Sequence, residues 1–222
     1  MKKTNWIITT ILVAALSVSA VAQSPNWASI TPDQKHIANL NFGWDYSLSL
    51  GLGYGYKIGT KIPILINGQF SIPAGENLDD DFKAKLGGQV RLVKAGNFMA
   101  TAIAYGIYRR YETEIVKFQN FGSEFTGVAG FYKPHWYAAG EFGFDKAVVT
   151  HINNSEVRRQ FNPSAADGWF IPMGGNFHYG IQTGCSVKFM DAYIKIGKTV
   201  DQYLKPTAVI PYYFQFGTNM RF

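Results

Sequence analysis

Apolar and polar residues alternate along most of the chain with a period of two. From 39 to 56 every even position carries a large apolar or aromatic side chain, whereas the odd positions carry Asn, Gly, Asp or Ser. Successive side chains of a β-strand point to opposite faces, so this period indicates strands rather than helices. By the same pattern we expect further strands at 62–72, 82–93, 97–111, 124–132, 136–150, 177–189, 192–200 and 210–222.

The two faces of these strands favour a membrane barrel over a soluble β-sandwich, which also alternates. The apolar faces are nearly complete and carry rings near their ends, such as Trp136 and Phe142, as lipid contact with aromatic girdles requires. The opposite faces are small and polar, as at Gly51 and Gly53, which suits the crowded inside of a narrow barrel. The composition agrees, with 16% aromatic residues, 23 glycines and only 16% charged residues.

The expected connections alternate between short and long. Outer-membrane barrels have short periplasmic turns and longer extracellular loops, so the short set is expected to face the periplasm. The short connections are at 57–60, 94–96, 133–135 and 190–191. The long connections are at 74–81, 112–123, 152–176 and 201–209.

The strand count needs one hidden hairpin, because the pattern gives nine segments and single-chain bacterial barrels have even numbers. The run at 38–56 is about twice the ~9 to 11 residues of a spanning strand. A turn at Gly43-Trp44-Asp45 would keep the alternation and place Phe42 opposite Tyr46. We therefore expect an all-β fold, a closed antiparallel transmembrane barrel of ten strands, with eight as the alternative. The segment at 124–132 is the weakest strand, since its two faces hardly differ.

The N-terminus is typical of a secretory signal. Residues 1–22 have a charged start, an apolar run from Trp6 to Leu16 and a small-x-small site at Ala20-Val21-Ala22. A retained helix is the alternative, but this run is shorter than the ~20 residues that span a bilayer. We expect residues 23–36 to form an N-terminal periplasmic segment and residues 37–222 to form the barrel. The net charge of +6 becomes +4 without Lys2 and Lys3, and no nucleic-acid motif accompanies it.

At this point the chain resembles the small bacterial outer-membrane β-barrel proteins. The resemblance rests on the signal, the alternating strands and a terminal Phe222 preceded by Tyr212, Phe214 and Phe216, and it covers the whole mature chain. It implies that these four rings form the sorting signal that the barrel-assembly machinery reads, although Thr218 departs from an all-apolar face. The expected location is the bacterial outer membrane. The expected partners are its lipids, the assembly machinery and periplasmic chaperones, with no nucleic acid.

Charged residues on the small faces are expected in the lumen. They are Asp45, Lys83, Lys85, Arg91, Glu141, Asp145 and Lys195. An unpaired buried charge is costly, so we expect Glu141 and Asp145 to pair with Arg91, Lys85 or Lys195 and to have a structural role. The alternative is a narrow ion or solute path that opens when such pairs rearrange. Porin-like bulk flow is not expected from ten strands.

An enzyme that acts on lipid at the extracellular mouth is a further alternative. Lipid A deacylases of similar architecture carry His-x-Ser on a strand, and none of the four histidines matches. A triad of His151, Ser155 and Asp167 is conceivable in the longest loop, but isolated polar loop residues are usually solvated. The acidic run at 79–81 lacks EF-hand spacing. We therefore expect no enzymatic activity, no cofactor and no metal.

The expected loop at 152–176 is the best candidate for a specific contact, because loops on a rigid scaffold carry function. It contains a mixture of cationic and aromatic residues, namely Arg158, Arg159, Phe161, Trp169 and Phe170. Such a mixture suits the phosphates of lipopolysaccharide or a protein partner. An irregular loop that folds over the barrel mouth is the equal alternative.

Overall fold

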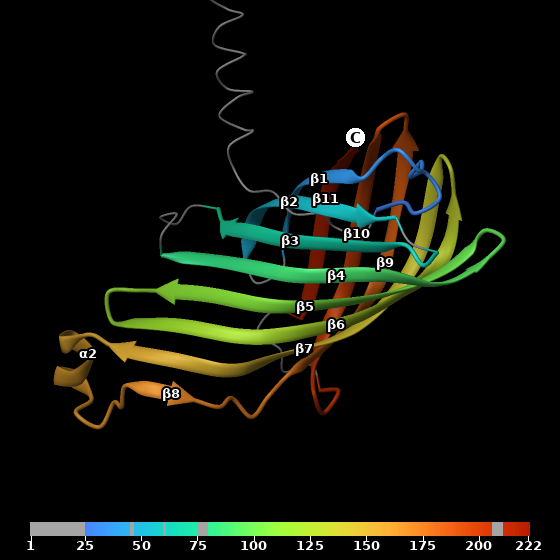
Figure 1. The fold of residues 1–222 in the computed structure, drawn as a ribbon. Helices are drawn as coiled ribbons and strands as arrows, with labels where there is room; N and C mark the ends of the chain where they lie inside the picture. The colour runs from blue at the N-terminus through green and yellow to red at the C-terminus, as the bar shows by residue number, and fades with distance from the viewer. Residues whose placement is uncertain (1–24, 45–46, 60, 75–79, 206–210) are drawn as a thin grey trace, which may run out of the picture.

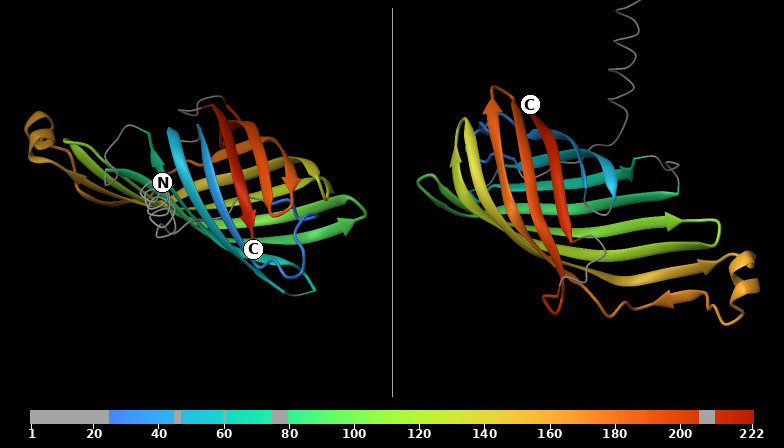
Figure 2. Two further views of the ribbon diagram at one scale, coloured as in Figure 1. Left: turned by 90° about the horizontal axis from the view of Figure 1, so that it is seen from above. Right: turned by 180° about the vertical axis from the view of Figure 1, so that it is seen from behind.

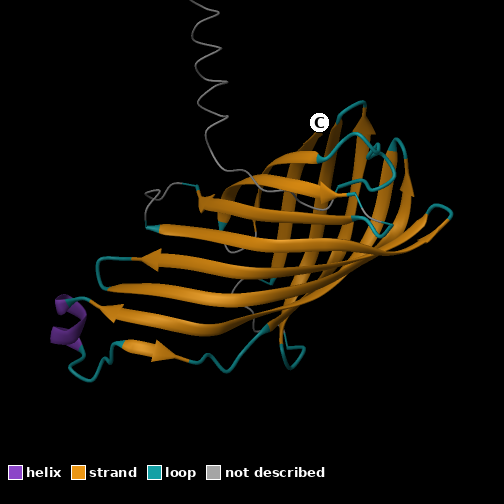
Figure 3. Ribbon diagram, viewed as in Figure 1, coloured by secondary structure: helices purple, strands orange, loops and turns teal. Residues whose placement is uncertain are grey.

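The structure is a computed structural model, and it describes residues 25–44, 47–59, 61–74, 80–205 and 211–222. The described chain is almost entirely β-structure (Figure 3). The predicted signal at 1–22 lies outside the described residues. The elements are β1 (His36–Trp44), β2 (Leu48–Ile58), β3 (Ile64–Pro73), β4 (Asp81–Ala95), β5 (Phe98–Glu112), β6 (Val116–Lys133), β7 (Trp136–Asn154), α2 (Glu156–Phe161), β8 (Gly168–Phe170), β9 (Asn176–Val187), β10 (Met190–Asp201) and β11 (Tyr212–Arg221).

Ten of the strands form a closed antiparallel barrel. Each strand pairs with its neighbour in sequence from β1 to β7, then β7 pairs with β9, β9 with β10, and β10 with β11. The pairing of β1 with β11 closes the ring (Figure 1). The short β8 pairs only with β7 and stays outside the ring. The predicted ten-stranded barrel is therefore confirmed, with one additional strand that the sequence pattern did not indicate.

The hidden hairpin is present, but its predicted turn is wrong. Gly43 and Trp44 belong to β1, and Phe42 lies opposite Leu50 rather than Tyr46. The strand continues because Gly43 also pairs with Gln215 of β11, so both edges of β1 are hydrogen-bonded to its end. The turn falls after Trp44, where residues 45–46 lie outside the described part of the chain.

The predicted long loop at 112–123 is also wrong, because strand pairing continues through it. β5 and β6 pair as far as Glu112 and Lys117, and only Thr113 to Ile115 connect them. The segment at 124–132 is part of β6, which has 18 residues. The polar residues at 112–123 resemble a loop in sequence, but β5 and β7 provide hydrogen-bond partners for the backbone of β6 on both sides.

Four strands are longer than the rest and extend beyond the barrel rim. β4 to β7 have 15 to 19 residues, whereas the other barrel strands have 9 to 12. The pairing of β7 with β9 ends at Asp145, and the rest of β7 continues outward to α2 and β8 (Figures 1 and 2). We call the outer ends of β5, β6 and β7 together with α2 and β8, residues 108–121 and 147–170, the wing.

The two faces of the barrel wall follow the predicted register. On β3, Leu65 is fully buried toward the lumen, whereas Ile66 is 50% exposed on the outside. Large apolar side chains remain exposed on the outer face of every barrel strand, for example Leu40, Leu86 and Ile194. Among the described residues, no helix is long and apolar enough to cross a bilayer.

The two ends of the barrel differ. One end, here called the turn end, carries the tight connections between β4 and β5, β6 and β7, and β9 and β10. The start of β1 and the end of β11 lie at the same end. The opposite end, here called the loop end, carries the wing and the long connections after β3, β7 and β10.

Candidate functional site

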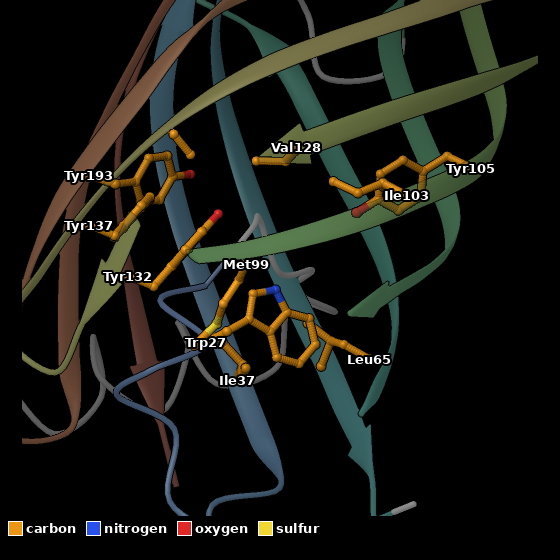
Figure 4. Close-up of a cluster of buried hydrophobic side chains, with 11 residues drawn as sticks. Trp27, Ile37, Leu65, Met99, Ile103, Tyr105, Val128, Tyr132, Tyr137 and Tyr193 are labelled. Carbon is orange, nitrogen blue, oxygen red and sulfur yellow. The ribbon is translucent and has the colours of Figure 1, made fainter. Parts of the chain in front are cut away.

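The turn end of the lumen is filled by packed side chains. Tyr132 and Tyr137 stack with parallel rings whose centroids are 5.2 Å apart. The indole of Trp27, which precedes the first strand, packs into the same cluster with Leu65 and Met99 (Figure 4). All five side chains are buried. The lumen is therefore occupied by apolar packing at this end.

Residues 25–35, which we call the cap, hold Trp27 in place. Asn26 is fully buried, and its amide nitrogen donates to the Lys133 carbonyl at 2.9 Å and to the Ser186 hydroxyl at 2.8 Å. The expected periplasmic segment at 23–36 therefore folds, over its described part, into the barrel opening. Ala28 and Ile30 pack against the same cluster as Trp27.

A buried ion pair fastens the cap to the barrel wall. Arg221 of β11 and Asp191 of β10 lie 3.2 Å apart, with side chains only 1% and 0% exposed. Arg221 also donates to the carbonyl oxygens of Ser29 and Lys188, and the Ser29 hydroxyl donates to Asp191 at 3.3 Å. The guanidinium group of Arg221 thus joins the cap to the turn between β9 and β10. Neither residue was predicted to have this role. Asp191 was expected in a short connection at 190–191, but it lies in β10, and Arg221 sits in an ordinary alternating position of β11.

The loop end of the lumen contains a polar cavity of about 570 Å³, which we call the chamber. Ile103 and Tyr105 line it where it meets the apolar cluster. The residues predicted for the lumen that line it are Lys83, Lys85, Glu141, Asp145 and Lys195. These residues come from β4, β7 and β10, so the closed ring brings together charges that are far apart in the sequence.

The carboxylate of Glu141 lies at the centre of this arrangement. Lys195 is 2.8 Å from one of its oxygens, and the Tyr213 hydroxyl donates to the other at 2.7 Å. Lys195 was one of the three predicted partners. The side chain of Glu141 is 3% exposed, so its charge is compensated inside the protein rather than by solvent.

A second ion pair in the chamber involves Glu124, whose inward position the sequence pattern did not indicate. Lys85 lies 2.5 Å from Glu124, which is on β6 directly opposite Asp145 of β7. Glu124 begins the segment whose faces could not be distinguished, so its direction was not predicted. His178 was missed as well, and it shares a hydrogen bond of 3.1 Å with the Thr126 hydroxyl. Its inward position follows from alternation along β9.

One residue of the predicted lumen cluster is not in this group, and a second is not described. Arg91 lies opposite Thr101 toward the turn end and does not line the chamber. Asp45 lies outside the described residues. Asp145 accepts from the side chain of Asn176 at 3.4 Å. Of the three cations predicted as partners, Lys195 is the one that pairs with Glu141.

The predicted contact loop is largely structured. The Ser155 hydroxyl caps α2 by accepting from the Arg158 amide at 3.3 Å. Asp167 accepts from the backbone and side chain of Asn154, each at 2.8 Å, and pairs with Arg159. These hydrogen bonds, the Asn154 amide foremost, lower the pKa of Asp167 below its usual value. Ser155 and Asp167 thus stabilise the loop, and the triad arrangement considered above is not formed.

A β-bulge at Val148 turns the upper part of β7. Ala147 pairs with Gly122 and Val149 with Phe121, so Val148 has no opposite partner. A bulge exchanges the faces of the residues that follow it. His151 therefore points outward, where its ring packs on Trp169 at 4.7 Å. Phe170 lies beside it opposite Thr150, and Phe161 at the end of α2 is 88% exposed.

The outer face at the loop end carries a continuous band of rings, which we call the aromatic band. It crosses five neighbouring strands and β8, with successive centroids 4.7 to 6.1 Å apart. Its members are Phe70, Phe82, Tyr108, Phe121, Trp169 and His151. Such a band is characteristic of a barrel at a membrane–water interface.

The terminal rings also face outward. Tyr212, Phe214 and Phe216 are exposed on β11. Phe222 stacks on His36 with centroids 5.5 Å apart, and the backbones of these two residues exchange hydrogen bonds of 2.8 and 2.9 Å. The last residue thus completes the seam between the first and last strands.

The acidic run at 79–81 is described only for Asp80 and Asp81. Asp81 points inward and accepts from Arg109 at 3.1 Å, and Asp79 lies outside the described residues. Within the described ranges, no group of three His, Cys, Asp or Glu residues is arranged to hold a metal ion.

A scan against protein-family models and a search of curated proteins found no match to the chain.

Proposed function

We propose that this chain is a bacterial outer-membrane β-barrel whose filled lumen serves a structural role and whose wing contacts the cell surface. The observation that carries the proposal is the outer wall. It combines exposed apolar side chains around the ring with the aromatic band at the loop end. Water would disfavour such a wall, whereas lipid tails and interfaces favour it. A closed ring also satisfies every backbone group without an exposed edge.

The cap and the apolar cluster support a structural lumen over a conducting one. A continuous path would have to displace Trp27 and the stacked pair of Tyr132 and Tyr137. It would also cross the buried pair of Asp191 and Arg221. The chamber is therefore a recess reached from the loop end, and the gated path remains the alternative.

We also propose that the chain is not an enzyme. The side chains of His151, Ser155 and Asp167, which could have formed a triad, each contact other residues instead. Lipids of the outer membrane are the proposed surroundings. The assembly machinery and periplasmic chaperones are the proposed partners during biogenesis, with the rings of β11 as the sorting signal. The exposed α2, with Arg158 and Phe161, is the proposed contact site for a surface ligand.

Fractionation tests the location. The full chain, expressed in a Gram-negative host, should sediment with the outer membrane and migrate faster on gels before boiling than after it. A closed barrel in detergent gives this heat-modifiable migration, whereas a soluble protein does not. Recovery in the soluble periplasmic fraction would refute the proposed location.

Recording in planar bilayers tests the filled lumen. The purified barrel should be electrically silent, since the cap and the apolar cluster occupy its turn end. A variant that lacks residues 25–35 should show at least brief openings if it retains heat-modifiable migration. Steady conductance by the unaltered protein would refute the structural proposal and support the gated path.

A further inference from the structure

A shallow groove lies on the outer wall of the barrel, on the opposite side of the sheet from the lumen. Its volume is about 590 Å³, and its lining comes from β3 to β7. Small residues form its floor at adjoining outward positions, namely Gly88, Ala102, Ala104 and Gly127. Among the described residues, none that lines the groove is charged.

Aromatic rings form one wall of the groove. Phe125 of β6 and Phe142 of β7 line it and are 61% and 57% exposed. Phe142 stacks on Phe177 at 5.6 Å, and Phe144, which also lines the groove, packs on the same ring at 4.7 Å. Because these rings support one another, the wall does not depend on a single rotamer. Ile64 lines the opposite side.

Of the two glycines in the floor, Gly127 is not required by the packing of the protein. A Cβ atom added at Gly127 would meet its nearest neighbour, the Phe142 carbonyl oxygen, at 3.8 Å, an ordinary contact. On the inward side of the same strand, a Cβ at Gly130 would lie 2.2 Å from the Ala138 carbonyl oxygen, so a side chain cannot fit there. The absent side chain at Gly127 therefore leaves room only on the outside.

Charges lie above the groove at the loop end. Tyr108, Arg110 and Glu112 share the outward face of β5 with Ala104, because Ile107 and Arg109 between them line the chamber. Arg110 and Lys117 both pair with Glu112, the latter at 3.0 Å, so two cations share one carboxylate. Arg110 and Lys117 thus place two cations just beyond the aromatic band.

The spacing between the charges and the groove matches one leaflet. Arg110 is six residues from Ala104 along β5, which is about 20 Å of strand. At the usual barrel tilt this corresponds to about 15 Å along the membrane normal, or half of the ~30 Å hydrocarbon core. A lipid with its phosphate at Arg110 would therefore extend its acyl chain into the groove.

We propose that the groove binds an acyl chain of an anionic membrane lipid, with the lipid phosphate against Arg110 and Lys117. This inference rests on the proposed membrane location of the barrel. A lipid chain fits the groove because the space is uncharged and continuous with the exposed apolar wall. Arg110 and Lys117 supply the charged donors for the phosphate of an anionic headgroup.

Photocrosslinking tests the proposal. The full chain is refolded into phosphatidylcholine vesicles that contain phosphatidylglycerol with a diazirine in its palmitoyl chain. Labelling mapped by mass spectrometry should be greater on β5 and β6 beside the groove than on β1 and β10, by roughly fivefold, the ratio that about 1 kcal/mol of preferential binding gives. Even labelling around the ring would overturn the groove but not the membrane location. No labelling on any strand would overturn both.

Matched variants separate the groove from general lipid contact. Gly127→Leu fills the floor and should reduce the labelling there to that of β1. Gly140→Leu is the control, because Gly140 also faces outward and a Cβ there meets its nearest neighbour at 3.9 Å, outside the groove. Ala104→Leu replaces Gly127→Leu if the latter loses heat-modifiable migration. Unchanged labelling in the groove variant overturns the proposal.

The headgroup is tested separately. Changing Arg110 and Lys117 together to Gln should abolish the preference for phosphatidylglycerol over a phosphatidylcholine probe with the same diazirine chain. An equal preference before and after the change would overturn the phosphate contact. Chemical crosslinking to a dimer, with both grooves protected from label, would overturn the lipid proposal in favour of a second copy of the chain.

Discussion

Replacing Asp191 by Asn should be among the most destabilising single changes in this barrel. Asp191 and Arg221 are both buried, so the change leaves a guanidinium charge without its counter-ion and away from water. Breaking a buried pair by removing one partner costs about 3 to 5 kcal/mol. Asn conserves the volume and retains one acceptor oxygen, so we expect the free energy of unfolding to fall by about 3 kcal/mol, the lower end of this range.

The assay is urea unfolding of the barrel refolded in vesicles, followed by the fraction that migrates as the compact form. Arg159→Gln is the matched control, because its pair with Asp167 is exposed and should contribute little. Trypsin gives a second readout. The side chain of Lys35 is exposed but its backbone is hydrogen-bonded to Phe222 and Lys57, so loosening of the cap should allow cleavage there. If Asp191→Asn unfolds with the same midpoint as the control and Lys35 stays protected, the reasoning about the buried pair is refuted.

The remaining predictions concern the chamber, the outer wall and the seam. In a double-mutant cycle of Glu141→Gln and Lys195→Gln, unfolding free energies should show a coupling of roughly 0.5 to 3 kcal/mol, and additive losses would exclude the pair. Ile66→Arg should destabilise refolding into vesicles by up to about 2 to 4 kcal/mol and clearly more than Gln69→Arg, which points into the chamber; equal stabilities would refute the register. Deleting Phe222 should reduce the assembled, heat-modifiable fraction without affecting export, and equal assembly would remove its proposed sorting role.

The strands and their faces could be predicted because the outer wall and the lumen of this barrel carry different kinds of side chain at alternate residues. The contrast between Asn39 and Leu40 is visible in the sequence, and it corresponds to the buried and exposed faces of β1. Strand ends were less predictable, since a turn and a strand with polar residues look alike. Gly43 and the polar run at 119–123 were assigned to a turn and a loop, yet both lie in strands that have backbone partners on each side.

The chamber was predictable only in part, because alternation gives the face of a residue but not its height or its cross-barrel partner. Lys195 and Glu141 are on strands that are separated by β9, and the curvature of the ring brings them together. Glu124 was missed because both faces of its strand carry small or aromatic residues. The bulge at Val148 has no signal in the alternation, so the outward direction of His151 was not predictable.

The cap limits how the chamber can communicate with the turn end of the barrel. A path through the lumen would have to break the pair of Asp191 and Arg221 and withdraw Trp27 from the apolar cluster. If breaking the pair alone costs about 3 to 5 kcal/mol, the open state is populated by at most roughly one molecule in 150 to 4,000 at rest. A gate would therefore need a ligand that binds the open state correspondingly more tightly. The pair of Glu141 and Lys195 lies in the chamber beyond this barrier, so its rearrangement alone would change the shape of a recess and not open a channel.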